Sequence, residues 1–150
     1  MEALKKKIDK FFEDYATRFT GAIGGKDPDI EGTVGSFSES FIEASPLGIH
    51  CRKNDEKFRE VIPQGYAFYK SIGTRTMTIL AKEISILDEL HAMVKVHWHS
   101  TYVSNKNMSE EIEFMVYYLV QVKAGLPKIF AYITGDEQKV LKEKGLIPGN

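Results

Sequence analysis

The apolar positions in the first twenty residues follow a helical period. Side chains three and four residues apart form one apolar face, which is typical of a helix packed on a core: Leu4, Ile8, Phe11, Phe12, Tyr15 and Phe19. The glycine-containing segment 21–25 predicts the end of this helix. Asp27-Pro28 then indicates the start of a short second helix that runs towards Phe37.

Two short strands and a third helix are predicted next. Residues 41–44 and 49–52 favour strands on either side of a Ser-Pro-Leu-Gly turn. Asn54 is a candidate N-cap for the helix, and two acidic residues follow it, where they suit the helix dipole. We expect that helix to be interrupted at Pro63 and Gly65.

From residue 74 onward the pattern becomes that of strands. Four segments rich in β-branched and aromatic residues are separated by polar or glycine-containing breaks: 74–87, 92–103, 113–123 and 128–134. Joined as a meander, they predict an antiparallel sheet. A short C-terminal helix is expected over 136–144, with Gly145 at its end. Helices first and a sheet second indicate one α+β domain over residues 1–150.

Alternation along two of these strands assigns the faces of the sheet. In the segment 92–103, one face carries Val94, Val96, Trp98, Ser100 and Tyr102, and the other carries Met93, Lys95, His97, His99 and Thr101. In the next strand, the row from Phe114 to Val122 is wholly apolar, and the opposite row is apolar in its middle. A strand with one face in water would alternate cleanly. We therefore expect the outer face to be covered, either by a second copy of the chain, since symmetric dimers are the commonest oligomers, or by a folded-back C-terminal segment.

Composition narrows the function classes. The 150 residues are 43% hydrophobic with a formal net charge of −1, so a broad basic surface for nucleic acid is not expected. Cys51 is the only cysteine, which excludes an internal disulfide and a thiolate metal cluster. The amphipathic N-terminal segment lacks the apolar core of a signal peptide, and no stretch approaches the roughly 20 apolar residues of a membrane span. We expect a cytoplasmic protein that binds no membrane.

Two stretches carry a resemblance to a known family. The segment 37–48, with its Ser45-Pro46-Leu47-Gly48 ending, resembles the strand of ketosteroid isomerases that ends in Asp-Pro-Val-Gly. The segment 122–129 resembles the last hairpin of the same proteins. Together with the order of elements, this is similar to the nuclear transport factor 2-like superfamily, which includes polyketide cyclases. The resemblance implies a cystatin-like cone, in which the N-terminal helices pack on a strongly curved antiparallel sheet.

The resemblance also implies a cavity, but without the isomerase's general base. The position of that base is occupied by Ser45, whose hydroxyl is too weak a base to take a carbon-bound proton unaided. Tyr15 and Tyr118 match the family's two hydrogen-bond donors to the substrate carbonyl, the second to within a residue or two. The candidate lining residues are Tyr15, Phe19, Phe41, Ser45, Val96, Trp98, Ser100, Tyr118 and Tyr132. A packed core built from the same side chains is the alternative.

Other candidate chemistry is weaker. His97 and His99 point the same way on one strand and would bind a metal only with a third ligand, such as Glu83 or Glu113. Because they lie on the outer face, polar residues of a dimer interface are the preferred interpretation, and no metal or cofactor is expected. Glu43 and His50 are predicted to lie on neighbouring short strands, within pairing distance.

Three hypotheses follow. The first is a dimeric domain that binds a small apolar or aromatic ligand in its cone. The second is an isomerase, cyclase or dehydratase acting on a small carbonyl compound, with Tyr15 and Tyr118 as donors and an unidentified base. The third is a protein-interaction module that uses the outer face of the sheet.

Overall fold

The computed structural model describes residues 2–104 and 106–149 and has four helices and six strands in these ranges. In chain order the elements are α1 (Glu2–Ile23), α2 (Ile30–Val34), β1 (Phe37–Ser45), β2 (Gly48–Lys53), α3 (Glu56–Ser71), β3 (Thr74–Ile86), β4 (His91–Val103), β5 (Ser109–Lys123), β6 (Leu126–Ile133) and α4 (Glu137–Glu143). The predicted α+β class is confirmed, with N-terminal helices on a curved sheet and a short C-terminal helix.

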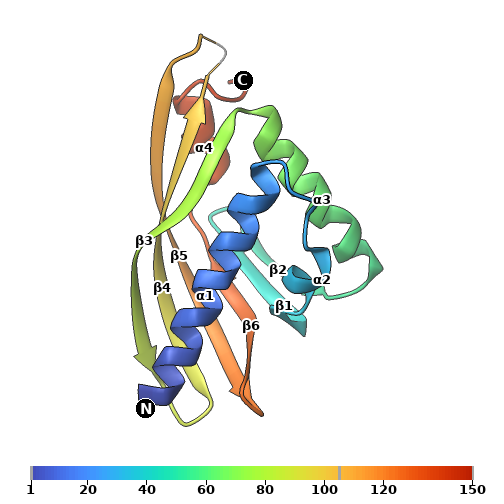
Figure 1. Ribbon diagram of the computed structural model, residues 1–150, viewed down its shortest axis with the longest axis vertical. Helices are drawn as coiled ribbons and strands as arrows, with labels where there is room; N and C mark the ends of the chain where they lie inside the picture. Colours follow the sequence, from blue (N-terminus) through green and yellow to red (C-terminus); the bar gives the residue numbers. More distant parts are fainter. Residues whose placement is uncertain (1, 105, 150) are drawn as a thin grey trace.

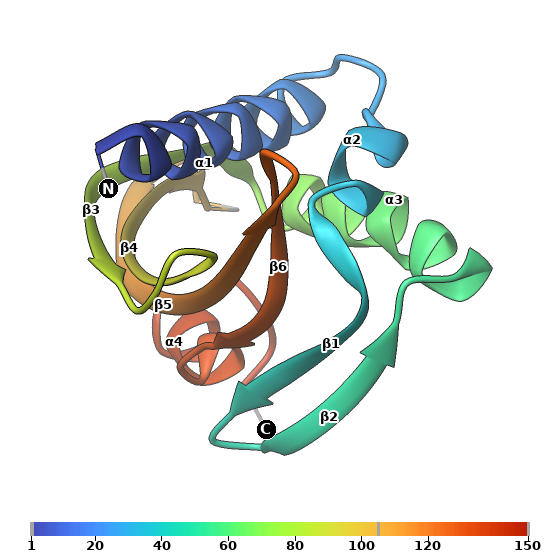
Figure 2. The ribbon, with the colours of Figure 1, turned by 90° about the horizontal axis from the view of Figure 1, so that it is seen from below.

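The six strands form one sheet in the order β2-β1-β6-β5-β4-β3. The predicted antiparallel meander from β3 to β6 is confirmed, and β1 adds to its edge by pairing in parallel with β6. Figure 2 shows the sheet curling around α1, with α2 and α3 on the side of the β1–β2 hairpin. Figure 1 shows α4 at the end of the sheet opposite the N-terminus. The result is a cone that is closed by helices along one side.

The core lies between α1 and the concave face of the sheet. α1 buries Ile8, Phe12 and Ala16, as its predicted apolar face requires. Val96 and Trp98 of β4 face the helix and are 0% and 3% exposed, so the face predicted for them from alternation is confirmed. Their neighbours on β5, Val116 and Tyr118, are also buried in this cluster. This shared inner face sets which side chains reach the cone's interior.

α3 differs from the sequence prediction at its N-cap and at Pro63. Its N-cap is Asp55, whose carboxylate accepts a hydrogen bond from the backbone N–H of Phe58. Asn54 instead donates from its side chain to the carbonyls of Val34 and Phe37, at 2.8 and 3.1 Å, and so ties α2 to β1. The helix also continues without interruption through Pro63.

Tertiary packing explains why α3 continues through Pro63. Pro63 cannot donate the backbone hydrogen bond that the turn before it would accept, which weakens an isolated helix. Ile62 and Tyr66 flank it and are buried against α1 and α2, so both halves of α3 are anchored. Propensity is a weak determinant where such burial holds both sides of a break.

Candidate functional site

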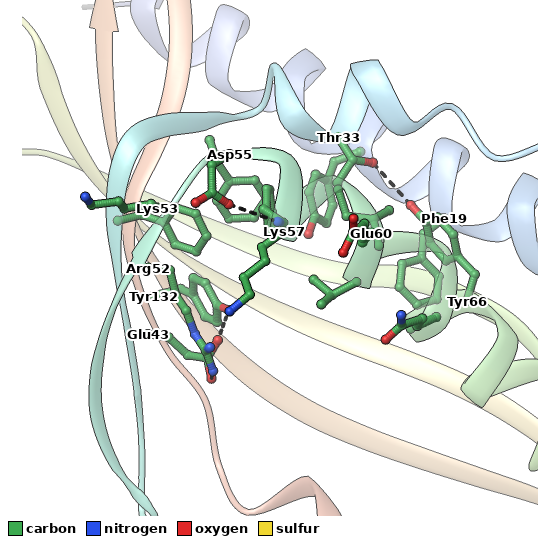
Figure 3. Close-up of a pocket in the computed structure, with 18 of the residues that line it drawn as sticks. Phe19, Thr33, Glu43, Arg52, Lys53, Asp55, Lys57, Glu60, Tyr66 and Tyr132 are labelled. Atoms are coloured by element: carbon green, nitrogen blue, oxygen red, sulfur yellow. Dashed lines mark hydrogen bonds and ion pairs between the residues drawn. The ribbon is translucent and has the colours of Figure 1, made fainter.

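A hollow of about 690 Å³ lies between α3, the β1–β2 hairpin and α1. Eight aromatic rings line it, and they come from four elements, α1, β1, α3 and β6: Tyr15, Phe19, Phe37, Phe41, Phe58, Tyr66, Tyr69 and Tyr132. Figure 3 shows Phe19 and Tyr66 at one end and Glu43, Arg52 and Tyr132 at the other. We call this space the outer hollow.

A second, smaller space of about 170 Å³ reaches further into the cone and is called the inner hollow. Trp98 of β4 and Tyr118 of β5 line it, together with Glu137 at the start of α4. Five aromatic side chains line both hollows: Tyr15, Phe19, Phe37, Tyr69 and Tyr132. The two spaces therefore adjoin across these rings.

Tyr118 and Tyr15 are two of the four phenols that line the inner hollow. The indole Nε1–H of Trp98 donates to the hydroxyl oxygen of Tyr118 at 3.1 Å. The hydroxyl proton of Tyr118 thus remains available to a further acceptor. Burial raises the pKa of Tyr118 well above its ordinary value, and burial likewise raises the pKa of Tyr15. Both phenols therefore keep their protons at neutral pH and act as donors.

The inner hollow also contains an acid. The hydroxyl of Tyr69 donates to a carboxylate oxygen of Glu137 at 2.5 Å, which joins α3 to α4. Burial raises the pKa of Glu137, and the hydrogen bond from Tyr69 opposes this increase. Burial, together with the neighbouring Glu137, raises the pKa of Tyr69 as well. A carboxyl group in a cavity whose pKa is raised by burial is a candidate for proton transfer.

The polar end of the outer hollow is built around Glu43. Its carboxylate accepts a hydrogen bond from Tyr132 at 2.7 Å and pairs with Arg52 at 3.6 Å. His50 lies opposite Glu43 in the strand pair, but the carboxylate turns to Arg52 and Tyr132. The charged lining is balanced, with three basic and three acidic residues: Arg52, Lys53 and Lys57 against Glu43, Asp55 and Glu60.

Six of the nine residues proposed from the sequence line one or both hollows: Tyr15, Phe19, Phe41, Trp98, Tyr118 and Tyr132. The other three do not belong to either lining. Ser45 lies at the end of β1, where its hydroxyl accepts the backbone N–H of Leu47. Val96 is enclosed in the core cluster, and the hydroxyl of Ser100 donates to the carbonyl of Ile112 at 3.4 Å.

Sequence reasoning missed the acid Glu137, the role of Glu43, and four aromatic residues of the outer hollow: Phe37, Phe58, Tyr66 and Tyr69. Glu43 precedes Ser45 by two positions and so shares its strand face, which is a signal that the sequence contains. Tyr69 and Glu137 are 68 positions apart and meet only through the packing of α3 and α4. No local sequence pattern predicts that Tyr69 and Glu137 form a pair.

The histidines of β4 lie on the outer face of the sheet, where their strand positions place them. His97 pairs with Glu113 at 3.3 Å and His99 with Glu111 at 3.6 Å. Among the residues that the structure describes, no group of three His, Cys, Asp or Glu side chains is arranged to hold a metal ion. Nor does any described helix have the length and apolar character needed to span a bilayer.

These features define a class of protein: a cone-shaped α+β domain whose curved sheet and helices enclose an aromatic hollow. The family model described as NTF2-like protein (DUF6841) matches residues 5–137, so the chain belongs to this NTF2-like family. The resemblance drawn from the sequence is confirmed. No curated protein matches the sequence.

Solved structures show the same fold at low sequence identity. An NTF2-like protein with a cystatin-like fold from Novosphingobium aromaticivorans is 10% identical, with a TM-score of 0.68 over 97% of this chain and 89% of that one. An NTF2-like protein of unknown function from Shewanella oneidensis is 16% identical, with a TM-score of 0.64 over 88% and 98%. A ketosteroid isomerase-like protein from Erwinia carotovora is 18% identical, with a TM-score of 0.60 over 85% and 92%.

Proposed function

We propose that this protein is a small-molecule-binding domain whose ligand occupies the outer hollow and extends into the inner hollow. The observation that carries the proposal is the hollow itself, about 690 Å³ lined by eight aromatic residues. Ligand sites in proteins typically measure roughly 300–1,000 Å³ and are mostly apolar with a few directed polar groups. A space of this size is more than a packed core needs, since interiors contain few voids larger than a water molecule.

The lining indicates the class of ligand. Aromatic walls favour a flat apolar body, because ring faces and edges pack well against one another. The balance of basic and acidic side chains favours a ligand without net charge. Phenolic donors at Tyr15 and Tyr118 suit a carbonyl or hydroxyl oxygen at the inner end. We therefore propose a neutral cyclic or aromatic compound with one or two oxygens.

Titration with small ketones followed by NMR tests this proposal. Trp98 is the only tryptophan, and its side chain lines the inner hollow, so its indole N–H signal is a unique reporter. A panel of 2-tetralone, 1-indanone and cyclohexanone is added to the ¹⁵N-labelled protein. We expect saturable shifts of the Trp98 signal with a Kd between about 1 mM and 1 µM, equivalent to roughly 4–8 kcal/mol. Unchanged spectra across the panel would contradict the proposal.

We also propose that the protein forms a homodimer through the outer face of the sheet. Four apolar side chains on this face are between 36% and 52% exposed: Met93, Met115, Tyr117 and Ile133. Tyr117 lies opposite Ile133 and next to the strand that carries Met93, so the four belong to adjoining strands. An apolar surface at the centre of a sheet favours a symmetric partner over solvent.

Sedimentation velocity of the wild type and Tyr117→Lys tests the dimer. The wild type is expected to sediment as a dimer at about 10 µM, and the variant as a monomer with the same thermal stability at low concentration. Tyr117→Phe is the matched control and should remain dimeric. A monomeric wild type at 100 µM would rule the dimer out and leave this face to a different partner protein.

A further inference from the structure

The carboxyl group of Glu137 has an unusual place in the fold. It belongs to the first residue of α4, yet it lines the inner hollow beside Tyr15, Trp98 and Tyr118. The hydroxyl of Tyr69 donates to one of its oxygens, which fixes the orientation of the carboxyl group. The described residues form no hydrogen bond with the other oxygen, which can therefore accept a proton or a hydrogen bond.

The groups around Glu137 are phenols and not cations. Tyr69 faces it from α3. Burial is the largest cause of the raised pKa of Tyr102 in β4, and the nearby charge of Glu137 raises it further. Tyr15, Tyr118 and Tyr132 complete the phenolic lining of the inner hollow. No lysine, arginine or histidine belongs to that lining among the described residues. The carboxylate is therefore not neutralised by an ion pair, and a proton from a ligand would relieve its desolvation.

We propose that Glu137 is the proton acceptor of the inner hollow and that Tyr69 is the residue that positions it. The inference rests on the proposed binding of a carbonyl compound. It places the missing base on α4, since the strand position that would supply it holds Ser45. In the proposed step, Glu137 takes a proton from the carbon next to the ligand carbonyl. The electron pair of the broken C–H bond moves to the carbonyl oxygen, which gives an enolate.

The donors for that enolate lie in the same space. Tyr118 keeps its own proton while accepting a hydrogen bond from Trp98, and donates to the enolate oxygen. The proton on Glu137 exchanges with solvent before the acid returns a hydrogen to the same carbon, so that the ligand exchanges its α-hydrogen with solvent. In a β,γ-unsaturated ketone the intermediate is a dienolate, and return of the proton to its γ-carbon isomerises the ligand. No oxidant, reductant or cofactor enters the balance.

Hydrogen exchange tests the role of Glu137 directly. Ketones that shift the Trp98 signal are incubated in D₂O with the wild type, and loss of their α-hydrogens is followed by ¹H NMR. We expect the wild type to exchange them faster than buffer does. Glu137→Gln should lose about 10²-fold or more of this enhancement, in the range of general base catalysis, while binding the ketone with similar Kd. Glu143→Gln, an exposed acid on the same helix, is the matched control and should keep the full rate.

Two further variants separate positioning from folding. Tyr69→Phe removes the hydrogen bond that lowers the pKa of Glu137, so the midpoint of the pH–rate profile should move to higher pH. A purely structural role would lower the rate without moving the midpoint. Glu137→Asp withdraws the acid by one methylene and should exchange at an intermediate rate, which provides a second test if Glu137→Gln is unstable.

The outcomes distinguish this inference from the proposed function. If a ketone binds but the wild type exchanges no faster than buffer, or if Glu137→Gln exchanges at the wild-type rate, Glu137 is not the proton acceptor and the binding proposal stands. If no ketone binds, the proposed function is wrong, and the inference fails with it.

Discussion

Replacing Tyr118 with phenylalanine tests how tightly the inner hollow is organised. The indole N–H of Trp98 donates to the Tyr118 hydroxyl at 3.1 Å, and Trp98 is only 3% exposed. Tyr118→Phe leaves that donor buried without its partner, which costs about 1–3 kcal/mol. For a chain of this length each kcal/mol lowers the Tm by roughly 2–4 °C. We expect a Tm about 4–8 °C below that of the wild type, from a loss near 2 kcal/mol.

The neighbouring tyrosine provides the matched control. Tyr117 is on the outer face of the same strand and is 36% exposed, so Tyr117→Phe should change stability by no more than about 0.5 kcal/mol. Urea unfolding followed by circular dichroism gives both values, with m-values that should agree with that of the wild type. The double variant Trp98→Phe/Tyr118→Phe removes donor and acceptor together. It should therefore show a coupling of about 1 kcal/mol relative to the sum of the single changes.

The reasoning fails if Tyr118→Phe and Tyr117→Phe have the same free energy of unfolding. It also fails if the double variant is simply additive, because the hydrogen bond between Trp98 and Tyr118 would then contribute nothing. In that case the phenol of Tyr118 would not be held in place for a ligand.

Three other changes test separate parts of the structure. Pro63→Ala restores a donor within α3 and should stabilise the protein by about 1–2 kcal/mol in urea unfolding; a loss of stability would show that the helix needs its proline. Lys82→Met removes the ammonium group that pairs with Glu13 and, at 2.9 Å, with Asp9. Because both carboxylates are more than half exposed, we expect the free energy of unfolding to fall by only about 1 kcal/mol. An unchanged free energy of unfolding would mean that solvent screens these pairs completely. Glu137→Gln should become progressively more stable than the wild type above pH 4.5, measured by Tm across pH 4–8. Burial raises the pKa of Glu137 from 4.5, so below that value both states are protonated, and as the pH rises the unfolded chain loses its proton first and the folded state is disfavoured. A pH-independent difference would contradict the raised pKa.

The sheet and the first helix were predictable because their patterns are local. The two-residue alternation of β4 is enough to place Val96 and Trp98 on the inner face, and the three- and four-residue spacing of α1 places Phe12 in the core. The parallel pairing of β1 with β6 was not predicted. It joins segments nearly 90 residues apart, and nothing in either strand specifies its partner.

The departures from prediction have physical causes of the same kind. Pro63 was expected to interrupt α3, but burial of the residues on either side outweighs the lost hydrogen bond. Asn54 has the side chain of an N-cap and uses it to hold α2 and β1, while Asp55 caps the helix. In the site, the resemblance to ketosteroid isomerases pointed to four of the eight aromatic residues that line the outer hollow: Tyr15, Phe19, Phe41 and Tyr132. Glu137 was missed because only the docking of α4 brings its carboxyl group to Tyr69.

The central claim, that the outer hollow is a ligand site, is tested most directly at Gly65. This residue lines the hollow from α3, and a Cβ placed on it would meet nothing within 4 Å. Gly65→Ala and Gly65→Leu should both stabilise α3, by up to about 1 kcal/mol, because glycine is a poor helix former. Only leucine projects far into the hollow.

Isothermal titration of the tightest-binding ketone to the wild type, Gly65→Ala and Gly65→Leu is the deciding measurement. We predict that Gly65→Ala binds with nearly the wild-type Kd, whereas Gly65→Leu, although at least as stable as the wild type, binds at least tenfold more weakly, which is about 1.4 kcal/mol. Equal affinity for Gly65→Leu and the wild type would show that the ligand does not occupy this hollow and would contradict the account.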